Sequence, residues 1–196
     1  KRRTRATIAK EKGLEPLAEI IFRQEETDPE KIAEGFVNEQ VEDINAAIAG
    51  AKDIIAEWIS ENETARMRLR LLYEKEAIIY SKVIKGKEAE GNKFSDYFEW
   101  SEPLKKCPSH RLLAMRRGEE EGFLRLTMEP GEDHALDILR SVFIKATNQS
   151  SEIVGEAVAD SWKRLLSASM ETEFRNISKE KADEEAIRVF ADNLRQ

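Results

Sequence analysis

The most constraining feature of this 196-residue chain is a run of apolar residues at steps of three and four. The run consists of Val41, Ile44, Ile48, Ala51, Ile55, Trp58 and Ile59. Because an α-helix has about 3.6 residues per turn, this spacing places the apolar side chains on one helix face. The pattern therefore predicts a long helix with one buried face.

Related patterns predict helices in most of the remaining chain. A short helix is expected over Thr4–Lys12, ended by Gly13, and Pro16 and Asp28 mark the starts of two more. With only 9 Gly and 5 Pro, the chain has few turn markers. The predicted fold class is mainly α, an irregular multi-helix bundle. Its further helices are expected over Ala65–Val83, His110–Arg117, Leu136–Phe143, Ile153–Leu165 and Ser178–Leu194, with Ser109 and Ser178 as N-caps.

The segment Gly86–Pro108 differs in composition, because it contains Phe94, Tyr97, Phe98 and Trp100 within seven residues. We expect a loop with a short helical turn held by these rings. At most one or two short strands are expected, near residues 122–128, since only Phe123–Met128 has strand character. A lone strand cannot pair its backbone within a helical region, so it could pair with a neighbouring domain. Residues 1–196 are interpreted as one helical region that could divide into sub-lobes 1–85 and 109–196.

Charge is distributed unevenly along the chain. Lys1–Lys12 holds six basic residues and one acidic residue, whereas the whole chain has a net charge of −7. Lys1, Arg2, Arg3 and Arg5 could contact a nucleic-acid backbone, or they could form a solvated terminal segment. A second and weaker basic stretch offers three further candidates for nucleic-acid binding: Lys105, Lys106 and Arg111.

The sequence carries no recognisable catalytic, cofactor or metal site. The stretch Gly86–Lys93 lacks the Lys-Ser/Thr ending of a phosphate loop. Cys107 and His110 have C-x-x-H spacing, but a structural zinc site requires four ligands. Nothing marks two carboxylates as a buried acid–base pair. We therefore expect no enzymatic activity, no cofactor and no metal ion.

The aromatic cluster has two interpretations. Rings beside lysines can stack on single-stranded bases, and Lys93, Lys105 and Lys106 flank the cluster. Alternatively, the four rings form a small core beneath a loop. Base stacking predicts partly exposed rings beside the lysines, whereas a satellite core predicts buried rings.

Location is constrained by cysteine content and hydropathy. The single cysteine, Cys107, cannot form an internal disulfide, which favours a reducing compartment. No apolar run approaches the roughly 20 residues of a membrane-spanning helix. We expect a cytoplasmic protein without membrane contact. Because the chain starts with lysine and stops within a helical pattern, we expect it to be a piece of a longer protein.

Several motifs occur in the order found in one family. Near the start they are Lys1–Ala9, Gly13-Leu14 and Pro16–Ala18, and near the end Ala186–Ala191 with Asn193-Leu194. The central block is the most specific and consists of Gly86-Lys87, Glu90-Gly91, Lys93–Phe98, Glu102–Leu104, Pro108–Arg111, Leu113-Ala114, Arg117-Gly118 and Glu121-Gly122. Together these segments resemble the Tex family of bacterial transcription accessory proteins.

The resemblance implies a nucleic-acid-binding, non-catalytic role in transcription. Tex proteins combine an N-terminal helical region with an RNase H-like domain, helix-hairpin-helix motifs and an RNA-binding barrel, and they are related to a eukaryotic elongation factor. This chain would be the helical region alone. Expected partners of the full-length protein are RNA or single-stranded or duplex DNA, the RNase H-like domain of the same chain, and the transcription machinery. The alternative is a scaffold that positions the other domains without binding nucleic acid itself.

Overall fold

The computed structural model describes residues 2–196 and confirms the mainly α fold class. The elements divide into two compact units, each made of two separate chain segments. The first unit contains the described residues up to Leu69 together with Asp133–Ser167, and the second contains Arg70–Glu132 and Ala168–Gln196. These units are discontinuous, whereas the expected sub-lobes 1–85 and 109–196 are continuous. No helix among residues 2–196 is long and apolar enough to cross a membrane.

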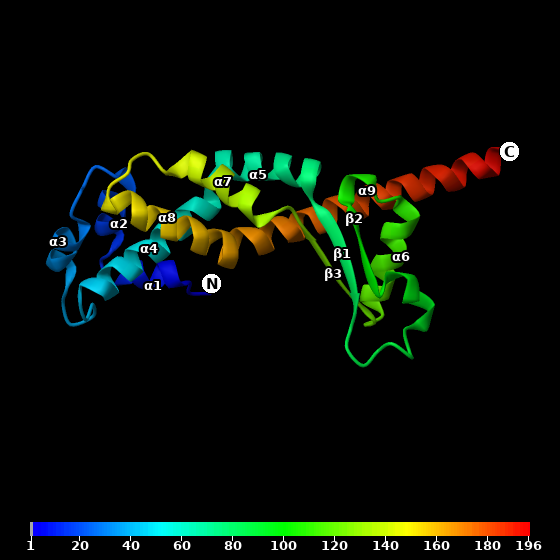
Figure 1. Cartoon of the computed structure of the whole chain (residues 1–196), viewed down its shortest axis with the longest axis horizontal. Helices are drawn as coiled ribbons and strands as arrows, with labels where there is room; N and C mark the ends of the chain where they lie inside the picture. The colour runs from blue at the N-terminus through cyan, green and yellow to red at the C-terminus, as the bar shows by residue number, and fades with distance from the viewer. Residues whose placement is uncertain (1) are drawn as a thin grey trace. The chain divides into compact units, whose positions relative to one another are not determined.

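The first unit is a helical bundle around α4 (Ile44–Glu61), which carries the apolar run identified in the sequence except Val41, a buried residue before the helix. Helices α1 (Arg5–Glu11), α2 (Glu15–Arg23) and α8 (Gln149–Ser161) pack against it, as Figure 1 shows. The unit also contains α3 (Pro29–Ala33), η1 (Glu34–Phe36), the start of α5 (Glu63–Glu76), and α7 (Glu132–Phe143) from Asp133 onward. Its fully buried side chains include Leu17, Ile21, Ile54, Ile55, Ile59 and Val158.

The predicted starts of α1, α2 and α3 are confirmed, whereas α7 and α8 each begin four residues before the expected Leu136 and Ile153. The Thr4 hydroxyl accepts a hydrogen bond from the backbone N–H of Thr7 and caps α1. Pro16 lies in the first turn of α2, and the Asp28 carboxylate caps α3. Gly13 ends the first helical segment with φ +80°, a conformation that glycine adopts without strain. Local capping chemistry therefore fixes where these helices begin and end.

Gln24 joins the end of α2 to the connection between α7 and α8. Its side chain is buried, and its Nε2 donates to the carbonyl of Phe143 at 2.7 Å. Its Oε1 accepts a hydrogen bond from the backbone N–H of Lys145 at 2.8 Å. Asn148, the cap residue of α8, donates from Nδ2 to the backbone carbonyl of Gln24. One residue thus satisfies polar groups along the whole connection between α7 and α8.

The second unit is built on a three-stranded antiparallel sheet with strand order β2-β1-β3. The strands are β1 (Ile78–Val83), β2 (Glu99–Pro103) and β3 (Leu124–Glu129). The expected helix over Ala65–Val83 is therefore wrong after Glu76, and the expected loop 86–108 contains a strand. Because β3 pairs with β1 along its whole length, the expectation of a lone strand, on which the pairing with a neighbouring domain rested, is also wrong. Around the sheet lie η2 (Asn92–Tyr97), η3 (Leu104–Lys106), α6 (Ser109–Glu120) and most of α9 (Ser167–Arg195).

A π-helical turn, η4 (Trp162–Leu166), connects α8 directly to α9. The predicted cap at Ser178 is wrong, because Ser178 lies inside α9 and its hydroxyl donates to the carbonyl of Phe174. The predicted cap at Ser109 is wrong as well, since Pro108 occupies the N-cap position of α6 and no side chain caps that helix. Side-chain type alone therefore misplaced two helix starts.

Candidate nucleic-acid interface

Arg2, Arg3 and Arg5 are exposed and line one cleft of about 940 Å³ in the first unit. Thr4, which lies between them, donates a hydrogen bond to Glu57 Oε2 of α4 at 2.9 Å, and this fixes the start of α1. Arg3 forms an ion pair with Glu11 on the surface. Lys1, the remaining member of the predicted group, lies outside the described residues.

The cleft contains charges of both signs. Lys10 and Arg164 add cations, and Asp53, Glu57 and Glu61 contribute carboxylates. Arg164 is engaged, because its Nη2 lies 2.8 Å from Asp160 Oδ2 and 4.0 Å from Asp53 Oδ1. Partial burial raises the pKa of Asp53, while Arg164 and Arg5 act in the opposite direction. Among the described residues, Arg2, Arg5 and Lys10 of this cleft form no ion pair.

The three basic residues predicted in the second unit have different surroundings. Lys105 and Lys106 are exposed in η3, whereas Arg111 of α6 is bound to a carboxylate. Arg111 Nη1 lies 3.0 Å and 2.9 Å from the two carboxylate oxygens of Glu102. Its guanidinium lies 5.1 Å from the ring centroid of Trp100, whose Nε1 donates to the same Glu102. Arg111 therefore serves a structural cluster of β2 and α6, and a phosphate would have to compete with Glu102.

Sequence reasoning missed Lys181 of α9. This exposed lysine lines a hollow of about 220 Å³ together with Lys105 and Lys106. It lies 75 positions beyond Lys106 in the numbering of the chain, within a polar stretch of a long helix. No local motif marks it, because only the fold brings α9 beside η3.

The aromatic cluster belongs to the core of the second unit. Phe94 is 6% exposed, and Tyr97, Phe98 and Trp100 are partly buried against the same core. Phe94 also packs near Phe123, with ring centroids 6.1 Å apart. Phe94 is buried as the satellite-core interpretation predicts, whereas the other three rings are only partly buried. The rings fasten η2 and β2 to α6 and the sheet.

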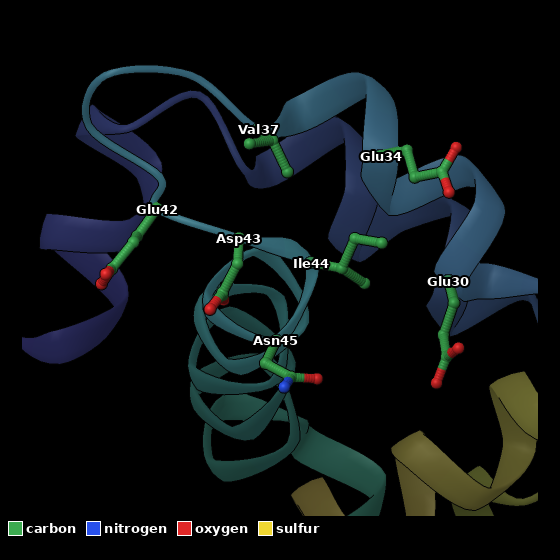
Figure 2. Close-up of a pocket in the computed structure, with 7 residues that line it drawn as sticks. All are labelled: Glu30, Glu34, Val37, Glu42, Asp43, Ile44 and Asn45. Carbon is green, nitrogen blue, oxygen red and sulfur yellow. The ribbon is translucent and has the colours of Figure 1, made fainter.

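An acidic hollow of about 600 Å³ lies at the start of α4 (Figure 2). Glu30, Glu34, Glu42 and Asp43 line it, beside Val37, Ile44 and Asn45. Asp43 is the N-cap of α4, because its carboxylate accepts a hydrogen bond from the backbone N–H of Ala46. Carboxylates repel phosphate, so this surface does not belong to the candidate interface. Among residues 2–196, no group of three His, Cys, Asp or Glu side chains could hold a metal ion.

Cys107 is half-buried beside Glu102. Burial raises the pKa of the Cys107 thiol to about 12, and the nearby Glu102 carboxylate contributes to a lesser extent. A thiol with this pKa is almost entirely protonated at neutral pH, and only the thiolate is a good nucleophile. The neighbouring His110 is exposed. The structure therefore supplies no activated Cys–His pair.

We expect Cys107 to react with iodoacetamide at pH 8 on the order of a hundredfold more slowly than an exposed cysteine. The matched reference is a Cys107→Ser, Ser101→Cys double variant, because Ser101 is exposed on the neighbouring strand. Glu102→Gln should accelerate labelling of Cys107 by removing the nearby negative charge. Mass spectrometry of the alkylated chain measures both rates. Equal rates for Cys107 and the reference cysteine would contradict the assigned pKa.

The chain is similar to known proteins over most or all of its length. Residues 24–190 match the family model described as Tex central region-like. The chain is 38% identical over 201 residues to the transcriptional accessory protein Tex of Neisseria gonorrhoeae and 37% identical over 211 residues to protein tex of Bordetella pertussis. It covers 27% of each of these relatives, with its own full length aligned. It is also 26% identical over 201 residues to the transcription elongation factor SPT6 homolog of Arabidopsis thaliana, of which it covers 12%.

Proposed function

Because the chain belongs to the Tex family, we propose that it is the helical central part of a transcription accessory protein and contacts nucleic acid through the cations at the start of α1. It acts by binding and not by catalysis. In the full-length protein its partners are RNA or DNA, an RNase H-like domain of the same chain and the transcription machinery. A cytoplasmic location accords with this role.

One observation carries the proposal of direct contact. Arg2, Arg5 and Lys10 gather at one cleft without ion pairs among the described residues. Exposed cations that lack carboxylate partners attract phosphate groups and release counterions when they bind them. Basic residues elsewhere in the chain are often paired, as Arg70 is with Glu173 and Arg175 with Glu119. The start of α1 is therefore the best phosphate contact in the first unit.

A scaffold role is the second candidate. The net charge of −7 and the carboxylates within the cleft oppose strong binding of a polyanion. In that case the two units position other domains of the protein. This alternative predicts that the isolated chain has no measurable affinity for nucleic acid at low salt.

The test is a titration of the 196-residue chain against labelled single-stranded RNA and duplex DNA over a series of salt concentrations. In a variant with Arg2, Arg5 and Lys10 changed to Ala, we expect weaker binding to RNA. The slope of log K against log salt should fall by about 2, because each lost contact to a single strand contributes roughly 0.7. Fluorescence anisotropy measures both quantities.

A matched control removes the same number of positive charges elsewhere in the first unit. Arg23, Lys31 and Lys145 are exposed, and their replacement by Ala leaves the start of α1 intact. This control should bind as the unchanged chain does. Equal weakening in the two variants would indicate a general charge effect and would reject a localised contact. Absence of binding by the unchanged chain at about 50 mM salt would favour the scaffold.

A further inference from the structure

We propose that the hollow lined by Lys105, Lys106 and Lys181 in the second unit binds a phosphate of a nucleic-acid backbone. This inference rests on the proposed function and assigns it a second contact, in a different unit from the start of α1. The hollow combines three lysines from two elements that are remote in sequence. We call this group the lysine hollow.

The backbone around the lysine hollow is held firmly. The N–H of Leu104 donates to the carbonyl of Ala77, just before β1, at 2.8 Å, and the N–H of Cys107 closes the η3 turn on the carbonyl of Leu104. On the opposite wall, Ala182 follows Lys181 and is 3% exposed within the core of this unit. The two walls are therefore fixed, while the long lysine side chains remain free to adjust to a ligand.

Charge distinguishes the lysine hollow from the other basic positions of the second unit. Within residues 2–196, none of its three lysines forms an ion pair. Neighbouring cations are already engaged, as Lys179 is with Asp183 at 2.8 Å and Arg111 is with Glu102 at 2.9 Å. Glu185 is the one carboxylate among the residues that line the hollow. A net positive surface thus persists on an acidic protein, and an entering anion would relieve the repulsion among the lysines.

The size and composition of the hollow suit a backbone phosphate. Its volume of about 220 Å³ is several times the roughly 30 Å³ share of one water molecule, which leaves room for a phosphate and ordered water. Ser109 adds a hydroxyl group to the lining, whereas the Ser178 hydroxyl already donates to the carbonyl of Phe174. Lysines bind phosphate as flexible point charges and carry no base preference. We therefore expect contact with the backbone and no sequence specificity.

The experiment compares two variants of the 196-residue chain. In the test variant, Lys105, Lys106 and Lys181 become Ala. In the control, the exposed Lys75, Lys82 and Lys85 of the same unit become Ala. Circular dichroism verifies that both fold. Single-stranded RNA and duplex DNA are titrated between about 50 mM and 200 mM salt, and inorganic phosphate is titrated separately by NMR.

We expect the test variant to bind RNA on the order of tenfold more weakly at low salt and to lose about 2 from the salt slope. The control should bind as the unchanged chain does. A variant with the same three lysines changed to Arg should retain binding, because the positive charges persist while the side chains differ. Retention by the Arg variant would separate a charge contact from a structural role of the lysines.

Three results would overturn the inference. If the test variant binds RNA and DNA like the unchanged chain, the lysine hollow makes no contact, while the proposed function stands through the start of α1. Inorganic phosphate could shift the NMR signals of the three lysines although the binding of RNA and of DNA does not require these lysines. In that case the hollow is a site for small anions. If the unchanged chain binds neither nucleic acid, the proposed function fails together with this inference.

Discussion

Replacing Gln24 with leucine is expected to lower the free energy of unfolding by about 3 kcal/mol. The substitution removes the donor to the carbonyl of Phe143 and the acceptor for the N–H of Lys145. Leucine has a similar size but no polar atoms, so both backbone groups lose their partner in a buried place. Each unsatisfied buried group costs about 1–3 kcal/mol.

Urea denaturation measures this loss, and hydrogen exchange locates it. Exchange should accelerate first at the end of α2 and in the connection between α7 and α8. Gln149→Leu is the matched control, since Gln149 is exposed at the start of α8. That control should change the free energy of unfolding by less than about 0.5 kcal/mol. A loss below about 1 kcal/mol for Gln24→Leu would show that water replaces both hydrogen bonds.

Gly118→Val is expected to destabilise the second unit by about 3 kcal/mol. A Cβ at Gly118 would lie 2.5 Å from Leu124 Cδ1, 2.9 Å from Leu124 Cγ and 3.1 Å from Phe94 Cδ1. Valine adds two further methyl groups at this contact, where α6 packs against β3. Side chains of a close-packed core have little room to move away. The denaturation midpoint and exchange within the sheet report the effect.

Gly155→Ala supplies the opposite expectation within α8. Its nearest neighbour would be Ile144 Cδ1 at 3.9 Å, an ordinary contact distance. Alanine favours a helix interior over glycine, so this variant should gain about 0.5–1 kcal/mol. Opposite signs at two helical glycines would confirm that packing, and not helix propensity, decides the effect at Gly118. Destabilisation of equal size at both positions would refute that explanation.

The helical part of the fold was predictable because capping and periodicity are local. Thr4, Pro16 and Asp28 give start signals that depend only on a few neighbouring residues, and α4 repeats its apolar spacing over several turns. Ser109 and Ser178 are also residues of a type that caps helices, but neither caps a helix in the structure. Each is a serine ahead of a helical pattern, but the surrounding packing continues the helix through Ser178 and places the cap at Pro108.

The sequence of β1 predicts a helix because its apolar pattern is ambiguous. Ile79 and Val83 are four residues apart, which fits one helix face as well as one strand face. The residue between them on the same strand face is Ser81, which is buried although polar and donates to the carbonyl of Tyr97 at 2.7 Å. A serine at that position hides the apolar alternation that would have indicated a strand.

The candidate site was predictable only in part, because ion pairing depends on the fold. Sequence shows that Lys105, Lys106 and Arg111 are basic and near one another. It does not show that Glu102 of β2 binds Arg111. Nor does it show that Lys181 of α9 lines the same hollow as Lys105 and Lys106. Whether a cation is available for a ligand is decided by residues brought together from separate segments.

Each unit consists of two separate chain segments, and this determines when it can fold during synthesis. The core of the first unit requires Val154 and Ala157 from its second segment, and the second unit requires Phe174 and Ala182. While the ribosome makes residues 70–132, the first segment waits for its partner, a delay on the order of several seconds. Neither core closes until most of the chain has emerged. Nascent chains stalled before Ser167 therefore expose apolar faces of α4 to chaperones.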